Sequence, residues 1–296
     1  MTMKDRVIIV TGANSGIGYE TTKGLAALGA HLVMVCRDQG KADEARRSIE
    51  EAVPGASLEI LLCDLASQVD VRRFAAEFKA GHDRLDVLHN NAGGIPNERK
   101  ETVDGIEWQL AVNHLAPFLM THLLMDILLA SVPSHVVTTS SGMYPRGIVD
   151  MDDLQAMRRY KPMNRYATTK LMNILFTRSL ARRLEGTEVR ANCLSPGLVD
   201  TGLSRDYGAF MKWLVRRIAK PQEEGGKTPV WVISDPELEG VTGSYFRNME
   251  CKDVSEKACD DDLAEALWEE SERLVGLTDE ERAAMPVRPE APSGAR

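Results

Sequence analysis

A tyrosine and a lysine four positions apart, Tyr166 and Lys170, have side chains and a spacing that could support catalysis. They open a helical pattern, and this spacing places the phenol and the ammonium on one face of a helix. A phenol has a pKa near ~10 and is a poor base at neutral pH. A cation ~4 Å away, at an effective dielectric of ~20, contributes about 4 kcal/mol, or roughly three pKa units. Such a pair could exchange a proton near neutral pH, as general acid–base catalysis requires.

Two serines and a glycine, Ser140 to Gly142, end the apolar run Val136–Thr139 that precedes this pair. In a parallel sheet, ligands bind outside the carboxyl ends of the strands. A hydroxyl at such a position can donate to a carbonyl oxygen as negative charge develops on it. The residues therefore predict acid–base chemistry at a carbonyl or hydroxyl carbon, although a simple Ser–Ser–Gly turn would show the same pattern.

Three glycines, Gly12, Gly16 and Gly18, lie where the apolar run Val7–Val10 gives way to a helical pattern. Glycines allow a tight turn and a close approach of the backbone to a ligand, and the N-terminus of a helix offers free N–H groups to a pyrophosphate. Because strand, turn and helix follow one another here, the segment predicts a dinucleotide-binding turn.

The end of the second apolar run indicates which dinucleotide is bound. An NAD-binding site has an acidic residue about 20 residues past the glycines, whereas a cation there suits the 2′-phosphate of NADP. This sequence has Cys36 and Arg37 at that point, which favours NADP(H), with NAD(H) as the alternative because Asp38 follows. Arg37 could also be one more solvated surface charge. Asp64, after the third run, could accept from an adenine amino group or cap the next helix.

These residues must be positioned by a regular alternation of short β-branched runs and longer helical patterns. The order predicts an α/β fold with a doubly wound parallel sheet and helices on both faces. The predicted strands are Val7–Val10, Leu32–Cys36, Leu58–Cys63, Val87–His89, Val136–Thr139 and Val189–Leu194. The predicted helices are Ile17–Leu28, Ala42–Ala52, Val69–Lys79, Ile106–Ala130, Ala167–Leu184 and Leu263–Val275. We expect one Rossmann-type domain over 1–280, with a lid around 201–222 and a flexible tail over 281–296.

The charge, the cysteine pattern and the apolar runs of the chain argue against several classes of protein. The 296 residues are 43% hydrophobic and carry a net charge of −8, which argues against a nucleic-acid binder because such proteins need a basic surface. The five cysteines form no CxxC pair, so we expect free thiols in a reducing, cytoplasmic setting. The sequence shows neither a targeting segment nor a run of ~18 apolar residues that would span a membrane. The acidic run Asp260–Asp262 is expected to cap a helix rather than bind a metal, and no metal is expected in the chemistry.

Taken together, these motifs resemble the short-chain dehydrogenase/reductase family. The resemblance covers roughly residues 5–275 and rests on motifs in the family's order, namely Thr11 to Gly18, Asn90 to Gly93, Asn113, Ser141, Tyr166 with Lys170, and Pro196–Gly197. It is closest to the retinol-dehydrogenase-like branch, through Val35–Asp38, Val112–Leu115, Lys170–Thr177 and Gly243–Phe246. The N-terminal membrane anchor of several animal relatives is not seen.

The resemblance implies a role for each catalytic residue. Tyr166 would exchange the proton with the substrate oxygen, and Lys170 would lower the pKa of Tyr166 and bond the nicotinamide ribose. Ser141 would orient the carbonyl, with its neighbour Ser140 as the alternative, and Asn113 would anchor a water of the proton relay. Asn90 to Gly93 would form the adenine-side floor. The residues expected to bind the cofactor are Gly12, Asn14, Ser15, Gly16, Ile17, Gly18, Arg37, Asp64, Leu65, Asn91, Ala92, Gly93, Tyr166, Lys170, Pro196, Gly197, Val199 and Thr201.

The expected activity is reversible hydride transfer between NADP(H) and a small lipophilic aldehyde, ketone or alcohol. The apolar residues of 203–220 could form a lid over the nicotinamide, pack against the body, or make weak peripheral contact with a membrane through neighbouring basic residues. A homodimer or homotetramer is expected through the helices containing Ile106–Ala130 and Tyr166–Leu184. Two alternatives remain, a non-turnover NADP(H)-binding regulator and a sugar-nucleotide epimerase or dehydratase. His89 before Asn90 is interpreted as a packed histidine rather than a ligand.

Overall fold

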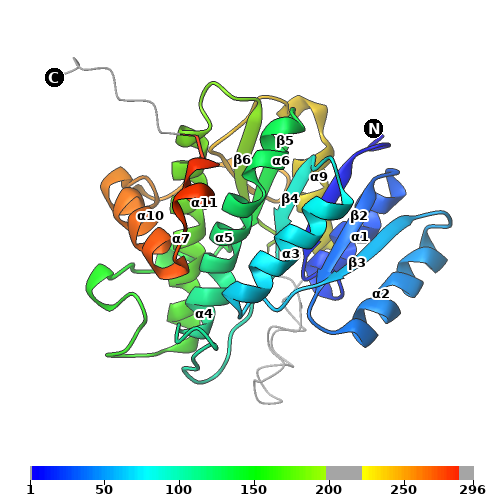
Figure 1. The fold of residues 1–296 in the computed structure, drawn as a ribbon. Helices are drawn as coiled ribbons and strands as arrows, with labels where there is room; N and C mark the ends of the chain where they lie inside the picture. The colour runs from blue at the N-terminus through cyan, green and yellow to red at the C-terminus, as the bar shows by residue number, and fades with distance from the viewer. Residues whose placement is uncertain (1, 198–221, 287–296) are drawn as a thin grey trace.

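The predicted apolar runs become the first six strands of a single sheet, which the computed structural model describes over residues 2–197 and 222–286 (Figure 1). The strand order is β3-β2-β1-β4-β5-β6-β7-β8, and every described pairing is parallel except that of β7 with β8. The strands are β1 (Val7–Thr11), β2 (His31–Cys36), β3 (Ser57–Leu62), β4 (Val87–Asn90), β5 (Ser134–Thr139), β6 (Val189–Ser195), β7 (Tyr245–Arg247) and β8 (Cys251–Lys252). The expected α/β fold is confirmed, with an antiparallel edge strand that the sequence did not indicate.

Helices cover both faces of this sheet, as a doubly wound fold requires. One face packs against α1 (Gly16–Ala27), α2 (Gln39–Ala52) and α9 (Gln222–Ser234). The other packs against α3 (Gln68–Gly81), α5 (Ala116–Leu123), α6 (Met125–Ala130) and α7 (Pro162–Arg183). Short 3₁₀ turns are η2 (Tyr144–Arg146), η3 (Met151–Asp153), η4 (Pro236–Leu238) and η5 (Glu256–Ala258). The apolar residues packed on the two faces of the sheet form two hydrophobic cores. The carboxyl ends of the parallel strands β1 to β6 lie along one edge of this sheet.

The long helix predicted over Ile106–Ala130 is wrong as a single element. The structure divides it into α4 (Trp108–Leu110), a π-helical turn η1 (Ala111–Leu115), α5 and α6. Pro117 lies just after the π-helical turn in this continuous helical run, where its missing N–H leaves one helical hydrogen bond unmade. A π-helical turn admits an extra residue into the helix and is often found at functional sites. Here it contains Asn113, which the next section places.

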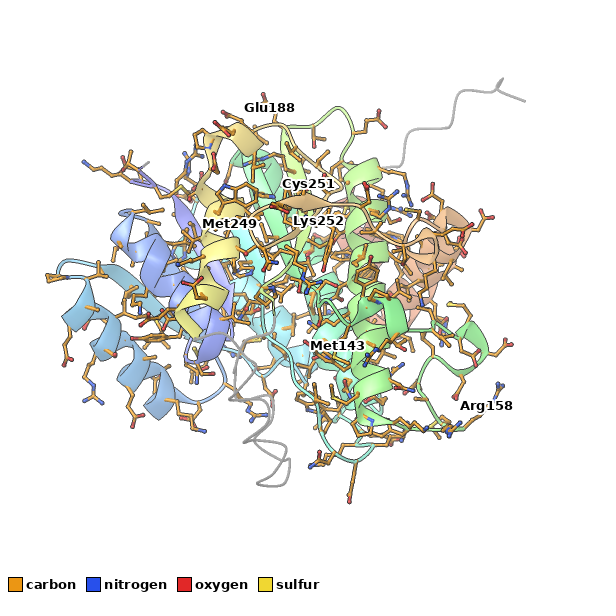
Figure 2. All side chains as sticks on the ribbon, turned by 180° about the vertical axis from the view of Figure 1, so that it is seen from behind. Met143, Arg158, Glu188, Met249, Cys251 and Lys252 are labelled. Carbon is orange, nitrogen blue, oxygen red and sulfur yellow. The ribbon has the colours of Figure 1, made fainter. Side chains whose placement is uncertain are left out.

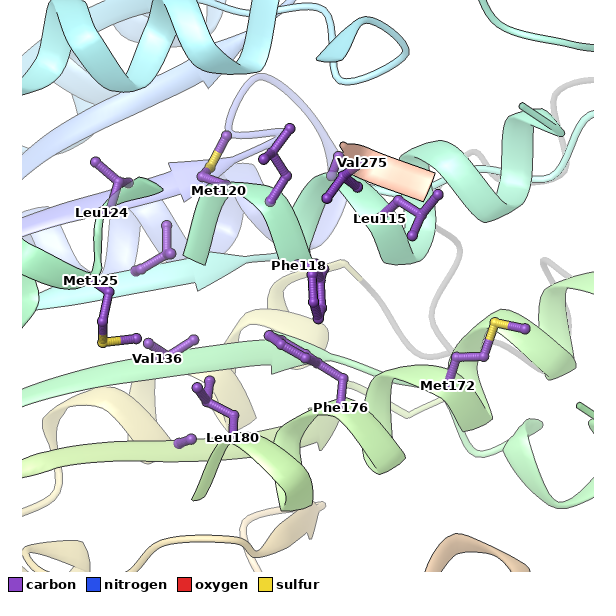
Figure 3. Packing of buried hydrophobic residues seen from close by; sticks show 14 of the residues in the cluster. Leu115, Phe118, Met120, Leu124, Met125, Val136, Met172, Phe176, Leu180 and Val275 are labelled. Carbon is purple, nitrogen blue, oxygen red and sulfur yellow. The ribbon is translucent and has the colours of Figure 1, made fainter. Parts of the chain in front are cut away.

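Two C-terminal helices, α10 (Asp261–Val275) and α11 (Asp279–Ala283), cover the outer side of α5 and α7 (Figure 1). Trp268 of α10 stacks on Phe176, with ring centroids 5.8 Å apart, and meets Phe118 edge-on at 5.0 Å. Figure 3 shows Phe118 and Phe176 facing each other between α5 and α7. The guanidinium of Arg183 lies 3.8 Å above the Trp268 ring. The helices expected to form an oligomer interface are therefore largely buried by the chain's own C-terminal helices.

Both C-terminal helices have recognisable caps. Asp260 accepts from the backbone N–H of Leu263, so the acidic run caps α10 as expected. Thr278 and Glu281 form a capping box at α11.

The range expected to be a flexible tail, 281–296, begins inside α11, and Met285 is buried. Residues 287–296 and nearly all of the expected lid, 201–221, lie outside the described residues. Within the described ranges, no helix is long and apolar enough to cross a bilayer.

Candidate active site

The glycine turn between β1 and α1 has the backbone geometry that a bound pyrophosphate needs. Gly12 and Gly16 adopt positive φ angles of 68° and 57°, which only glycine takes without strain. A Cβ on Gly18 would lie 2.3 Å from the carbonyl oxygen of Gly12, so no other residue fits there. Ser15 caps α1 without a side-chain hydrogen bond. The first N–H groups of the helix can therefore donate to an anion.

Thr11 at the end of β1 ties this turn to the loop after β4. Its hydroxyl accepts from the backbone N–H of Asn91 at 2.9 Å and of Ala92 at 3.0 Å. The Asn91 amide donates in return to the carbonyl oxygen of Thr11 at 2.8 Å. Thr11 was not among the predicted binding residues, because its role depends on two loops 80 residues apart in sequence. The predicted cofactor residues Asn91, Ala92 and Gly93 lie beside the glycine turn.

The residues after β2 and β3 lie at the same edge of the sheet. Cys36 is buried, whereas Arg37 and Asp38 are exposed. Asp38 caps α2 by accepting from the N–H of Lys41 at 2.9 Å. Asp64 accepts from Ala66 N–H at 3.0 Å. Since Ser67 caps α3, the helix-capping alternative for Asp64 is wrong.

Tyr166 and Ser141 form the centre of the candidate site. The phenol of Tyr166 lies near the Ser141 hydroxyl, which lowers the pKa of the phenol, and Ser141 is the second residue after β5. Tyr166 lies on α7, which begins at Pro162 and presents the Lys170 ammonium 5.5 Å from the centre of the Tyr166 ring. Both side chains are almost fully buried. Helix α7 thus brings the predicted Tyr–Lys pair to the carboxyl edge of β5.

Burial raises the pKa of Tyr166, whereas its spacing from Lys170 predicts that this pKa is lowered. Loss of solvent raises the pKa of Tyr166 to about 12, and the nearby Ser141 hydroxyl offsets this only in part. Burial also lowers the pKa of Lys170 to about 7, because an ammonium is disfavoured away from water. The sequence argument assumed an exposed pair at an intermediate dielectric. In the structure, the phenol holds its proton at neutral pH, as a general acid must.

The two neighbouring serines have different partners. The Ser140 hydroxyl donates to the backbone carbonyl of Lys170 at 2.7 Å and is buried. The hydroxyl of Ser141 is instead within reach of the phenol. Geometry therefore favours Ser141 for contact with a substrate, and it gives Ser140 a role in fixing β5 against α7.

Asn113 joins the π-helical turn to the loop after β4. Its side-chain oxygen accepts from Gly94 N–H at 2.9 Å, and its amide donates to the carbonyl oxygen of Gly94 at 3.1 Å. A Cβ built on Gly93 would lie 3.0 Å from the Asn113 oxygen and 3.5 Å from the Lys170 nitrogen. Asn113, Lys170 and Gly93, all predicted site residues, are therefore close to one another.

Contacts that no local motif indicated hold these elements together. The buried side chains of Glu107 and Arg165 form an ion pair at 2.7 Å, which links the start of α4 to α7. The Ser195 hydroxyl accepts from Gly142 N–H at 2.9 Å, and Arg247 lies close to Gly142. His89 is fully buried beside Thr139, and its pKa is lowered to about 3, so it is a packed histidine as expected. Pairings between distant segments such as these leave no pattern in a sequence.

All the predicted site residues that the structure describes lie at the carboxyl edge of the sheet. Pro196 and Gly197 follow β6, and Gly197 has a positive φ of 87°. Val199 and Thr201 lie outside the described residues. Figure 2 labels Met143, which follows the Ser141 turn, and Met249, in the exposed turn that joins β7 to β8. The turn, the free helix N-terminus and the Tyr166 cluster fit a nicotinamide dinucleotide, with its phosphates at Gly12 to Gly18.

Comparison with known proteins agrees with this geometry. The model of the short chain dehydrogenase family matches residues 6–212. Human retinol dehydrogenase 14 is 42% identical over 93% of this chain and 88% of that protein. Human retinol dehydrogenase 13 is 37% identical over 93% of this chain and 86% of that protein.

Solved structures show the same fold. An uncharacterised protein from Mycobacterium Paratuberculosis superposes with a TM-score of 0.75 at 32% identity, covering 93% of this chain and 95% of that one. A Beutenbergia cavernae protein, described as an NAD(P)-dependent gluconate 5-dehydrogenase with bound NADP, has a TM-score of 0.68 at 25% identity, covering 83% and 96%. The chain belongs to the short-chain dehydrogenase/reductase family, in its retinol-dehydrogenase-like branch.

Proposed function

We propose that this protein is an NADP(H)-dependent oxidoreductase that interconverts an apolar aldehyde or ketone and its alcohol, with Tyr166 as the general acid and base. The observation that carries the proposal is the buried Tyr166 phenol, which lies near the Ser141 hydroxyl just past the carboxyl end of β5. A carbonyl oxygen placed between these two hydroxyls would receive two hydrogen bonds. Membership of a dehydrogenase family and the retinol dehydrogenases among the relatives support the reaction class.

In the direction of reduction, the bound nicotinamide would supply the hydride. Tyr166 would then give its phenolic proton to the oxygen as negative charge develops there, while the Ser141 hydroxyl orients that oxygen. Lys170, whose pKa is lowered by burial to about 7, could hold or release a proton beside the phenol. Asn113 would carry the proton path onward through a bound water, as its position beside Lys170 and Gly93 allows.

Preference for NADP(H) rests on the residues after β2. One oxygen of the Asp38 carboxylate accepts a helix N–H, so Asp38 serves as the cap of α2. Arg37 is exposed at the same edge and offers a cation to a 2′-phosphate. The NADP bound in the Beutenbergia cavernae structure is consistent with this choice.

A lipophilic substrate is proposed from the relatives, which are named retinol dehydrogenases. The segment expected to form the lid lies outside the described residues, so the lid and its membrane contact remain proposals.

The five cysteines are unpaired, which supports a reducing, cytoplasmic compartment. A homodimer or homotetramer would have to form through surfaces other than the covered sides of α5 and α7.

The test is NADPH oxidation, followed by nicotinamide absorbance, with a panel of apolar aldehydes and ketones that includes retinal. Wild type is compared with Tyr166→Phe and with Tyr19→Phe, a control that removes a phenol from the contact between α1 and α2. We expect turnover in wild type and in the control, and none in Tyr166→Phe. Tight NADPH binding without turnover on any member of the panel would favour the regulator alternative.

A further inference from the structure

Two histidines and a glutamate meet at the edge of the sheet opposite the active site. His31 begins β2, Glu59 lies on the edge strand β3, and His82 follows the last turn of α3. Side chains on one face of a strand repeat every two residues. His31 therefore shares the α3-facing side with the buried Val33, and Glu59 shares it with Leu61. Since β2 runs from His31 to Cys36, the cluster lies about 16 Å from the cofactor edge.

The three potential ligand atoms are close enough to share one ion. The Glu59 carboxylate lies 3.0 Å from Nε2 of His82 and 3.4 Å from Nε2 of His31. All three atoms are within 4.8 Å of one another. In a tetrahedral zinc site with bonds of about 2.0–2.1 Å, neighbouring ligand atoms are about 3.3 Å apart. The two distances to the carboxylate bracket that value.

Hydrogen bonds to the other ring nitrogens orient both imidazoles. Nδ1 of His82 is 3.1 Å from the carbonyl oxygen of Phe78, and since a carbonyl only accepts, this nitrogen carries a proton. The Phe78 ring stacks on His82 at 4.4 Å and holds its plane. Nδ1 of His31 is 2.7 Å from the Ser57 hydroxyl. Metal-binding histidines usually make such a second bond, because it fixes the ring and directs the free nitrogen.

A cation between His82 and Glu59 would satisfy the polar atoms that face each other there. With a proton on Nδ1, a neutral His82 would point the lone pair of Nε2 at a carboxylate oxygen 3.0 Å away. Such a contact is repulsive unless a second proton or a metal cation lies between the two atoms. A second proton satisfies one imidazole, whereas a divalent cation satisfies both imidazoles and the carboxylate together.

We propose that His31, Glu59 and His82 bind one divalent transition-metal ion, with Zn²⁺ as the best match to two imidazoles and one carboxylate. The fourth position faces solvent, because all three side chains are partly exposed. The ion would join β2, β3 and the end of α3. It would thereby pin the edge strand β3 without touching the catalytic residues.

The test is Zn²⁺ binding by calorimetry at pH 7.5 on chelator-treated, full-length protein. The exposed Cys251 and Cys259 are first alkylated, and the other four histidines of the chain are buried, so background binding is low. We expect one Zn²⁺ per chain, at least ~10-fold weaker binding in His31→Gln and in His82→Gln, and unchanged binding in Glu44→Gln, an exposed carboxylate on α2.

Thermal unfolding gives an independent readout. At a Zn²⁺ concentration 100 times the dissociation constant, the wild-type Tm should rise by roughly 3–8 °C, and that of Glu59→Gln by much less. Circular dichroism confirms that each variant is folded. Absence of saturable binding, or equal binding by wild type and both histidine variants, would overturn the proposal and leave a proton-bridged ion pair.

Discussion

The ammonium of Lys170 donates a 2.8 Å hydrogen bond to the carbonyl oxygen of Thr139, the last residue of β5. This bond fixes α7 against the end of β5, beside the serine that contacts Tyr166. Burial leaves this ammonium where little water reaches, and the loss of solvation lowers the pKa of Lys170 to about 7. The positions of Tyr166 and Lys170, the proposed catalytic pair, and their shifted pKa values thus have one structural cause, the burial of α7 against the sheet.

Burial of Lys170 makes stability depend on pH. Between pH 7 and about 10, the unfolded chain protonates this lysine more fully than the folded protein does, so its contribution to stability rises with pH. We expect the free energy of unfolding of wild type, relative to Lys170→Met, to increase by about 2 kcal/mol from pH 7 to pH 9. Urea unfolding without nucleotide, at both pH values, measures it. A difference that stays constant or decreases would contradict the assigned direction.

The two adjacent serines should respond differently to the same substitution. Ser141→Ala removes a donor from the reacting oxygen and should lower kcat by roughly 10²–10³, with little effect on stability. Ser140→Ala removes a buried bond to α7 and should cost about 1–2 kcal/mol of stability. Steady-state kinetics and urea unfolding on both variants make the comparison. A larger loss of kcat in Ser140→Ala, with stability unchanged, would exchange the roles.

Arg37 should set the preference between the two dinucleotides. Arg37→Ala removes the cation proposed to contact the 2′-phosphate, and the NADPH to NADH ratio of kcat/KM should fall by roughly 10- to 100-fold. The matched control is Arg47→Ala, an exposed arginine on α2, which should leave the ratio unchanged. An unaltered ratio in Arg37→Ala would identify Arg37 as an ordinary surface charge.

The buried ion pair of Glu107 and Arg165 should be essential to the scaffold. Glu107→Ala leaves the Arg165 guanidinium buried without its carboxylate and should cost about 3–5 kcal/mol of stability. The double variant Glu107→Ala with Arg165→Met should recover part of that loss, because no charge is then left unpaired. Denaturant unfolding of the single and double variants checks the coupling. Additive losses would show that the two side chains act independently.

Local sequence patterns predicted most of the strands of the fold. The first six strands are apolar runs with flanking turns, so their limits could be predicted to within two residues. Strands β7 and β8 have three and two residues and are too short to produce a pattern. The π-helical turn at Asn113 lies inside an unbroken apolar stretch, where periodicity gives no warning. It is stabilised by tertiary contacts with Gly94, which only the folded chain provides.

The features of the candidate site also fall into those that the sequence could predict and those that it could not. The glycine turn, Tyr166, Lys170 and Asn113 could be found from spacing and family motifs, because each lies at a fixed place in the chain. The direction of the two pKa shifts could not, since it depends on how deeply α7 is buried beneath neighbouring elements. The cluster of His31, Glu59 and His82 was also missed, because its members come from three elements and match no contiguous motif.

The most direct test of the central claim is a single-turnover measurement of NADPH oxidation by an apolar aldehyde in wild type and Tyr166→Phe, with the NADPH dissociation constant measured on the same samples. If Tyr166 donates the proton, the rate constant should fall by at least ~10³ in the variant, while NADPH affinity changes by no more than about twofold. A Tyr166→Phe enzyme that keeps its rate within about tenfold of wild type would contradict the assignment.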